Sequence, residues 1–181
     1  MTFTLATATL ADVPLLTRLV NSAFRGEASR LGWTCEADLI EGGQRIDENE
    51  MRAMLAAPAA ALLLCRTATG ETLGCFHVQA KAGGVLYLTM LAVAPVGQGL
   101  GVGKFLLQAA EEFGQRHQCT MSRMSVISLR PELIAFYERR GYRSTGVTEP
   151  FPADPKFGIP RQDLRLLILE KSLSPLGVSA A

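Results

Sequence analysis

The feature that most constrains this chain is a glycine-rich loop over residues 97–104, which lies between two apolar segments. The segment before it, residues 85–93, is rich in strand-forming residues. In the segment after it, apolar residues recur at the spacing of one helical face, at Val102, Phe105, Leu106, Ala109, Ala110 and Phe113. The sequence therefore predicts a strand, a turn and a helix, with the glycines at the start of the helix.

The position of these glycines predicts an anion-binding site. The first backbone N–H groups of a helix have no partner within the helix, and the positive end of the helix dipole adds to their attraction for an anion. Glycine has no side chain, so a phosphate can approach these groups closely. We interpret the loop as a phosphate cradle. The alternative is a glycine-rich turn that only packs the helix on a sheet.

Spacing decides between the known phosphate-binding patterns. The Walker pattern fails, because Gln98 stands at its first glycine and Phe105 stands where Ser or Thr should bind Mg²⁺. The dinucleotide pattern G-x-G-x-x-G fails because Lys104 stands at its third glycine. What remains is Gln98-x-x-Gly101-x-Gly103 after a strand. This pattern resembles the Q/R-x-x-G-x-G/A signature of the GNAT superfamily of N-acetyltransferases.

A second segment, residues 130–142, resembles another signature of that family. There, a strand is followed by Asn, by a helix that carries Phe-Tyr or Leu-Tyr, and by Gly and an aromatic residue. Phe136-Tyr137 and Gly141-Tyr142 match, whereas Arg130 stands at the Asn position. In the family, this Asn helps to hold the pantetheine arm. Arg130, which stands in its place, is expected either to face a phosphate or to point to solvent.

The resemblance implies a cosubstrate, acetyl-CoA, and a set of site residues. Its binding residues would be Leu91, Ala92, Val93, Gln98, Gly99, Leu100, Gly101, Val102, Gly103, Lys104, Arg130 and Phe136. Two catalytic groups are implied: a backbone N–H near Leu91, at a strand bulge, for the oxyanion, and the Tyr137 hydroxyl as the acid for the leaving thiolate. The alternative for Tyr137 is a core aromatic residue beside Phe136. No metal is implied.

The expected fold class is α/β, with a mixed central sheet flanked by helices, as in the acyl-CoA N-acyltransferase fold. Apolar runs with short connections predict an antiparallel meander, and a strand, crossover helix and strand predict a parallel unit at its centre. The predicted strands are 3–7, 59–67, 72–81, 85–93, 119–127, 142–147 and 164–170. The predicted helices are 9–25, 36–41, 47–56, 101–116 and 131–141, and a proline-rich loop spans 149–160. Residues 1–171 would form one domain, followed by a loose tail, 172–181.

The acceptor side of the site is left open by the sequence. Candidates for a general base are Glu36, Asp38, Glu41, His77, Thr89 acting through a water, and Asp163. Residues 27–50 are rich in carboxylates and contain Trp33, the only tryptophan. This stretch is either a solvated connection with Trp33 as a packing anchor or an acceptor-binding loop that attracts a cationic acceptor.

Composition limits the function classes. A formal net charge of +1 gives no electrostatic argument for a nucleic acid or an anionic membrane as partner. No run reaches the ~18 apolar residues of a membrane span, and the N-terminus lacks signal-peptide features. The spacing of the four cysteines indicates reduced thiols rather than a zinc site, and reduced thiols are typical of a cytoplasmic location. The sequence leaves open whether the protein forms a homodimer.

The expected function is therefore acetyl transfer from acetyl-CoA to a primary amine of a small molecule. Two alternatives stay open at this point. One is acetylation of protein N-termini or lysines, which needs an open groove for an extended chain. The other is an acyl-CoA-binding regulatory module without turnover, against which the presence of Tyr137 argues.

Overall fold

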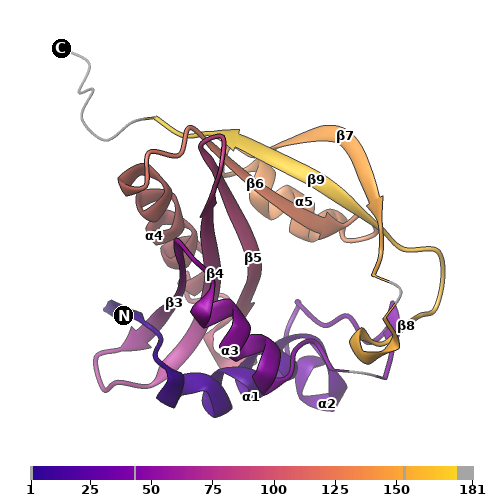
Figure 1. Ribbon diagram of the computed structural model, residues 1–181. Helices are drawn as coiled ribbons and strands as arrows, with labels where there is room; N and C mark the ends of the chain where they lie inside the picture. The colour runs from indigo at the N-terminus through magenta and orange to yellow at the C-terminus, as the bar shows by residue number, and fades with distance from the viewer. Residues whose placement is uncertain (1, 43, 153, 175–181) are drawn as a thin grey trace.

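The computed structural model describes residues 2–42, 44–152 and 154–174. Its main feature is a seven-stranded mixed sheet with the order β1-β3-β4-β5-β6-β9-β7 (Figure 1). The strands are β1 (Phe3–Thr7), β3 (Ala60–Thr67), β4 (Thr72–Lys81), β5 (Val85–Val93), β6 (Met121–Ile127), β7 (Arg143–Pro150) and β9 (Arg165–Ser172). Two short strands, β2 (Ile40–Glu41) and β8 (Ile159–Pro160), pair separately. The mixed sheet with flanking helices confirms the predicted fold class.

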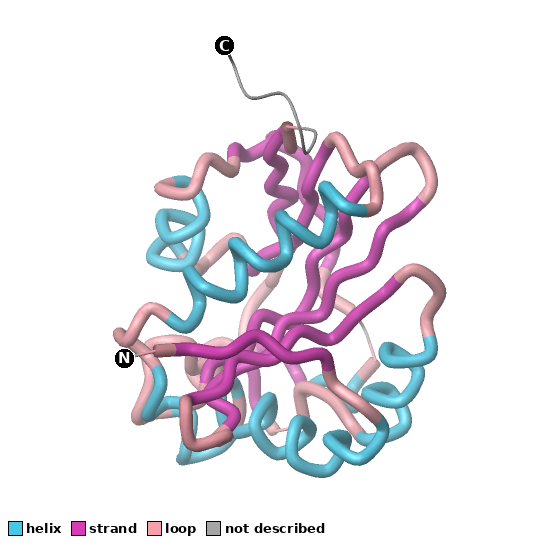
Figure 2. Tube along the Cα trace, turned by 90° about the vertical axis from the view of Figure 1, so that its left-hand side faces the viewer, coloured by secondary structure: helices cyan, strands magenta, loops and turns pink. Residues whose placement is uncertain are grey.

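Helices cover both faces of the sheet (Figure 2). They are α1 (Val13–Phe24), α2 (Gly26–Ser29), α3 (Glu48–Ala56), α4 (Val102–Arg116) and α5 (Pro131–Glu138), with 3₁₀ turns η1 (Leu10–Asp12), η2 (Pro95–Gly97) and η3 (Pro155–Phe157). Alternation along β3 divides the core: Leu62 and Leu64 pack with α1 and α3, whereas Leu63 packs with α4 on the other face. Burying each such leucine contributes about 1.5–3 kcal/mol, so both helical layers are held mainly by the sheet.

Several local predictions are confirmed. The strands β3, β4 and β5 form an antiparallel meander, and β5 pairs in parallel with β6 after the crossover helix α4. The helix predicted from residue 9 begins there with a capping box, in which the Thr9 backbone N–H donates to the Asp12 carboxylate at 2.8 Å. The four cysteines are unpaired, and Cys65, Cys75 and Cys119 are buried.

Other predictions need correction. Residues 36–41 do not form a helix; Ile40 and Glu41 instead pair with β8, a segment 118 residues later in the chain that local periodicity does not reveal. β7 runs on to Pro150, three residues beyond its predicted end. Ser172 still belongs to β9, and Leu173 is buried with its N–H bonded to Thr120 O at 2.8 Å, so the tail does not begin at 172. Residues 175–181 lie outside the described residues.

The separation of two central strands shapes the site. β5 and β6 pair only from Val85–Met121 to Leu88–Met124, although β5 continues to Val93 and β6 to Ile127 (Figure 1). On its other edge, β6 pairs with β9 along its whole length, from Met121–Ser172 to Ile127–Leu166. The sheet therefore has two arms, one led by β5 and the other by β6 and β9, which are not paired with each other beyond Leu88 and Met124.

Candidate active site

A cavity of about 530 Å³ lies between these two arms. Residues of the β5 strand and the glycine loop line one side, and residues of the β6 end and α5 line the other. Most of the residues predicted from the sequence meet here, namely Leu91, Val93, Gln98, Gly99, Gly101, Val102, Gly103, Lys104, Arg130, Phe136 and Tyr137. Two motifs about thirty residues apart in the chain thus converge on one cavity.

Two predicted binding residues do not line the cavity with their side chains. Ala92 points to the opposite face of the sheet, where it is fully buried beside α1. Leu100 points outward and is 48% exposed. Strand alternation explains Ala92, because its neighbours Leu91 and Val93 face the cavity.

The glycine end of the cavity, which comprises residues 97–104, presents backbone N–H groups. The bond from Phe105 N–H to Gly101 O, at 3.0 Å, is the first of α4, so the N–H groups of Val102, Gly103 and Lys104 precede the helical ladder. Gly101, the N-cap, has φ 92° and no side chain that could cap them. A Cβ at Gly99 or Gly101 would meet no atom within 4 Å, so open space lies over this end of the helix. These donors fit a phosphate anion.

Basic side chains add positive charge at this cavity. Lys104 lies in the first turn of α4, and Arg139 and Arg140 follow α5; all three line the cavity. The Arg140 guanidinium lies over the Phe136 ring, 3.5 Å from its centroid, and donates to Phe136 O at 2.5 Å. No site role was predicted for Arg139 or Arg140 from the sequence. Their position directly before Gly141, within the second motif, is the signal that could have identified them.

A β-bulge occurs where β5 passes the cavity. The pairing with β4 runs from Cys75–Ala92 to His77–Thr89, so the single residue Phe76 lies opposite both Met90 and Leu91. Met90 has φ 60°, a left-handed conformation that is rare for a residue with a side chain. Such an extra residue re-aims the local backbone. The bulge thus lies at the position that the sequence analysis predicted near Leu91.

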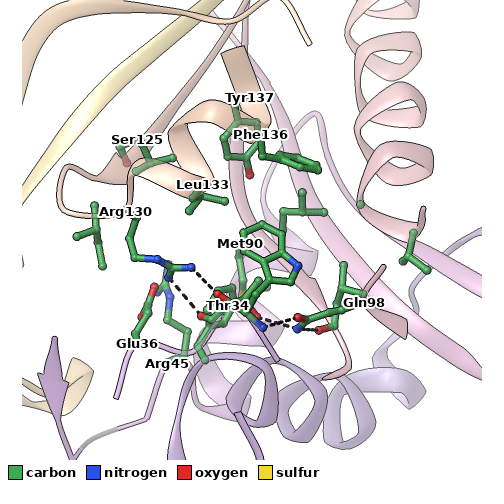
Figure 3. A pocket seen from close by; sticks show the side chains of 18 of the residues that line it. Thr34, Glu36, Arg45, Met90, Gln98, Ser125, Arg130, Leu133, Phe136 and Tyr137 are labelled. Carbon is green, nitrogen blue, oxygen red and sulfur yellow. Dashed lines mark hydrogen bonds between the residues drawn. The ribbon is translucent and has the colours of Figure 1, made fainter. Parts of the chain in front are cut away.

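Tyr137 is a buried residue whose side chain faces the cavity (Figure 3). Its ring packs edge-on against Phe136 at 5.1 Å, and no hydrogen bond from its hydroxyl is found within residues 2–42, 44–152 and 154–174. Burial raises the pKa of this hydroxyl above its ordinary value, so that it stays protonated at neutral pH. The residue is therefore a core aromatic that keeps a protonated hydroxyl at the cavity wall, and its role as the acid stays a prediction.

A short segment, Trp33–Thr34, bridges the two arms, and we call it the strap. From the glycine loop, Gln98 accepts from the Trp33 N–H at 2.8 Å and donates to the Thr34 hydroxyl at 2.9 Å. From the start of α5, Arg130 donates to the carbonyls of Trp33 at 2.9 Å and Thr34 at 3.3 Å (Figure 3). The Trp33 ring also packs against Phe136, at 6.0 Å.

These contacts correct the expectations for Arg130. Its side chain is buried and forms an ion pair with Glu132, so it does not point to solvent. Its other donors are directed at strap carbonyls rather than at the glycine end. Arg130 lines the cavity, and its contact with the cosubstrate stays a prediction.

The end of the cavity opposite the glycine loop carries a second group of arginines. Arg25 and Glu36 form a buried ion pair, and Arg45 lies next to them against the Phe24 ring. We call Arg25, Glu36 and Arg45 the arginine end. The sequence alone gives no signal for Arg25 or Arg45, because neither belongs to a motif and their proximity depends on tertiary packing against α1.

Most of the candidate bases lie outside the cavity. Of the six, only Glu36 lines the cavity. Asp38 and Glu41 are exposed and pair with Arg30 and Arg161, respectively. His77 is buried, bonded to Thr89 Oγ1 at 2.8 Å, and burial lowers its pKa. Asp163 is exposed and does not line the cavity.

Comparison with known protein families decides the relationship. The family model of the GNAT acetyltransferase domain matches residues 36–152, which is more than half of the chain. The chain belongs to the GNAT acetyltransferases. A search of curated protein sequences found no match.

Solved structures of other GNAT acetyltransferases share the fold at low identity. A candidate phosphinothricin N-acetyltransferase is 15% identical with a TM-score of 0.72, over 96% of this chain and 99% of that one. The ribosomal-protein-S18-alanine N-acetyltransferase of Escherichia coli is 15% identical with a TM-score of 0.70, over 99% of both chains. Nourseothricin acetyltransferase is 14% identical with a TM-score of 0.67, over 96% of this chain and all of that one. These proteins act on different acceptors, so the likeness shows the fold and not the acceptor.

Membership of the GNAT acetyltransferases makes this protein an enzyme that uses an acyl-CoA to acylate nitrogen. The donor set at the glycine end fits the phosphates of such a cosubstrate. Within the described residues, no helix has the length and apolarity needed to cross a membrane, and no cluster of His, Cys, Asp and Glu is placed to hold a metal ion.

Proposed function

We propose that this enzyme transfers the acetyl group of acetyl-CoA directly to a primary amine of a small molecule. The observation that carries the proposal is the arrangement along one cavity of three kinds of group: the N–H donors that start α4, the bulge at Leu91 and the Tyr137 hydroxyl. Acetyl-CoA supplies an activated thioester. In the reaction a bond forms between nitrogen and the acetyl carbon, the carbon–sulfur bond breaks, the amine loses a proton and the sulfur gains one.

The glycine end would hold the pyrophosphate. The N–H groups of Val102, Gly103 and Lys104 supply directed donors, and the Lys104 ammonium supplies charge. Such donors are fixed by the helix, so no side chain has to be ordered when the anion binds. Binding here aligns the rest of the cosubstrate along the cavity toward the bulge.

At the bulge, the backbone N–H of Leu91 would stabilise the oxyanion that develops on the carbonyl oxygen. A donor fixed in the backbone needs no reorganisation as charge develops, and removing one such donor typically costs about 3–4 kcal/mol in the transition state. Tyr137, held protonated by burial, would donate to the departing sulfur. The two groups thus act on opposite ends of the bond that breaks.

The strap favours the hypothesis of a small acceptor over that of a peptide. Because Gln98 and Arg130 tie Trp33–Thr34 to both arms, the chain crosses the cavity on that side. An extended peptide needs a groove that is open along its length, whereas a short amine needs only a pocket. Acceptors named for similar structures range from a ribosomal-protein alanine to nourseothricin, so the acceptor is argued from the cavity alone.

The test is release of free CoA thiol from acetyl-CoA in the presence of a panel of amines and short peptides, with mass detection of the acetylated product. We expect small primary amines to be acetylated and peptides to react poorly. A parallel panel of longer acyl-CoA donors tests the preference for acetyl. Acetylation of peptides but not of small amines would overturn the small-molecule part, and release at the background hydrolysis rate with every amine would overturn amine acetylation itself.

A further inference from the structure

The arginine end contains one more cation than it has carboxylate partners. Arg25 pairs with Glu36, and Arg130 pairs with Glu132. Arg45 is the exception: its guanidinium takes part in no hydrogen bond or ion pair within the part of the chain that the structure describes, and it lies over the Phe24 ring, 5.8 Å from the ring centroid. Glu50, whose charge also acts on Arg45, is itself paired with Lys156 at 2.9 Å.

The position of Arg45 is fixed by its backbone. Asn21 of α1 accepts from the Arg45 N–H at 2.6 Å, accepts from the Ile46 N–H at 3.3 Å and donates to Ile46 O at 2.9 Å. One turn further along α1, Phe24 supports the guanidinium. These contacts hold Arg45 at the cavity wall, where Figure 3 shows it beside Glu36 and across the cavity from Gln98.

Arg45 is half-buried, and the nearest carboxylates, Glu36 and Glu50, are each already paired with another cation. A partly desolvated cation in this situation gains stability when a ligand brings it an anionic partner. The planar guanidinium presents a fork of donors that matches a carboxylate in a bidentate manner. Phe24 lies against this fork, and Met90, Ile127 and Phe151 are further apolar residues of the cavity wall. The carboxylates of residues 27–50 do not supply a cationic-acceptor site, since of these only Glu36 lines the cavity and it is already paired with Arg25.

We propose that the acceptor is an amino acid or a close analogue, whose carboxylate binds Arg45 while its amine faces the thioester near Leu91 and Tyr137. This inference rests on the proposed function, because it names the substrate class of the same cavity. It places the two anions of the reaction at opposite ends: the phosphates of the cosubstrate on backbone donors and the carboxylate of the acceptor on a side chain.

The test compares matched acceptor pairs, each an amino acid and its carboxamide, with acetyl-CoA as donor. The wild-type enzyme should have the higher kcat/KM for the carboxylate member. Arg45→Met keeps an unbranched apolar stem against Phe24 but removes the guanidinium and its charge, and it should reduce this preference roughly 10- to 100-fold, the range for losing hydrogen bonds to a charged group. Because both enzymes see the same two amines, differences in amine pKa cancel in the ratio.

Controls separate this effect from general damage. Arg52→Met removes an exposed arginine of α3 that lies outside the cavity, and it should keep the preference. Arg45→Lys keeps the charge but loses the fork, and it should fall between wild type and Arg45→Met. In the presence of CoA, an N-acetylated amino acid should raise the melting temperature of the wild type more than its amide does.

The outcomes distinguish this inference from the proposed function. Equal rates for both members of each pair in the wild type, or a preference for neutral or cationic amines, would overturn the inference that the acceptor carries a carboxylate. Amine acetylation itself would stay intact. A preference that persists in folded Arg45→Met would overturn the role of Arg45. If acetyl-CoA binds but no amine of any charge is acetylated, the proposed function fails, and this inference fails with it.

Discussion

The two ends of the cavity offer different chemistry to two substrates. The glycine end, residues 97–104, presents the backbone of one continuous segment and needs left-handed glycines, with φ 80° at Gly99 and 92° at Gly101. The arginine end presents side chains of Arg25, Glu36 and Arg45, which come from separate positions along a folded-back segment. The first end is determined by local conformation and the second by tertiary packing.

This difference explains what can vary between related enzymes. A phosphate cradle built from N–H groups depends on the path of the backbone, so few sequences at that place allow it. A carboxylate site built from an arginine depends on one side chain and its neighbours. We therefore expect the glycine end to be intolerant of substitution, and the arginine end to change acceptor preference without loss of cosubstrate binding.

The largest expected effect is at the glycine end. Gly101→Glu should abolish acetyl-CoA binding, because the new carboxylate enters the open space over the start of α4 and repels the phosphates. Calorimetric titration measures this directly. Gly70→Glu is the matched control: Gly70 has φ 88° and equally open surroundings in the β3–β4 turn, so it carries the same backbone strain outside the cavity. Unchanged affinity in folded Gly101→Glu would refute the cradle.

Between the two ends, Tyr137→Phe should lower turnover roughly tenfold to a thousandfold, as expected for losing a general acid. Affinity for acetyl-CoA should change by less than about tenfold, because a ground-state thioester gains little from the hydroxyl. The measurement is steady-state kinetics on an accepted amine, together with a binding titration and a thermal melt. Full turnover in a folded variant would leave proton delivery to water or to the ammonium of the acceptor.

Tyr142→Phe is the matched control for that variant. Tyr142 is also a buried tyrosine near α5, but its hydroxyl bonds to Ser122 Oγ at 2.9 Å and donates to Glu111 at 3.3 Å, away from the cavity. Its loss should reduce the free energy of unfolding by about 0.5–1.5 kcal/mol per hydrogen bond and leave turnover intact. Equal kinetic effects of the two substitutions would argue that Tyr137 acts only through packing.

The strap joins the two arms of the sheet, and Arg130→Gln should loosen it. We expect the free energy of unfolding to fall by roughly 1.5–3 kcal/mol and the KM for the acceptor to rise, since two carbonyls lose a charged donor. Acetyl-CoA affinity should show no salt-dependent difference from wild type. A loss of affinity that shrinks at high salt would instead place Arg130 at a phosphate, as one alternative from the sequence holds.

The smallest effect is expected for Gly103→Ala. The new Cβ would lie 3.3 Å from Phe136 Cζ, so that the ring must shift by a few tenths of an ångström, and acetyl-CoA affinity should fall less than about tenfold. Gly114→Ala, in the same helix, would place a Cβ 2.7 Å from Leu86 Cδ2 in the core. That control should lower the melting temperature more and affinity less; the reverse order would show that Gly103 is critical to the cradle.

The sequence predicted those parts of the structure that depend on neighbouring residues. The meander and the crossover helix follow from periodicity and from turn glycines, and most of the residues that the two motifs single out line one cavity, whereas their contact with a cosubstrate stays a prediction. Insertion of β9 between β6 and β7 is a long-range pairing that local patterns do not encode. For the same reason, local patterns predict a helix at Ile40, which lies in β2, and give no signal that Arg45 lines the cavity.

The central claim, that the two ends serve different substrates, is tested most directly by one set of titrations. Acetyl-CoA affinity is measured by calorimetry for wild type, Gly101→Glu and Arg45→Met, with thermal melts to confirm folding. We predict no detectable binding of acetyl-CoA by Gly101→Glu. For Arg45→Met we predict an affinity within about threefold of wild type, which corresponds to a difference in binding free energy of at most about 0.6 kcal/mol. A large loss of acetyl-CoA affinity in folded Arg45→Met would contradict the account, because it would place the cosubstrate at the arginine end.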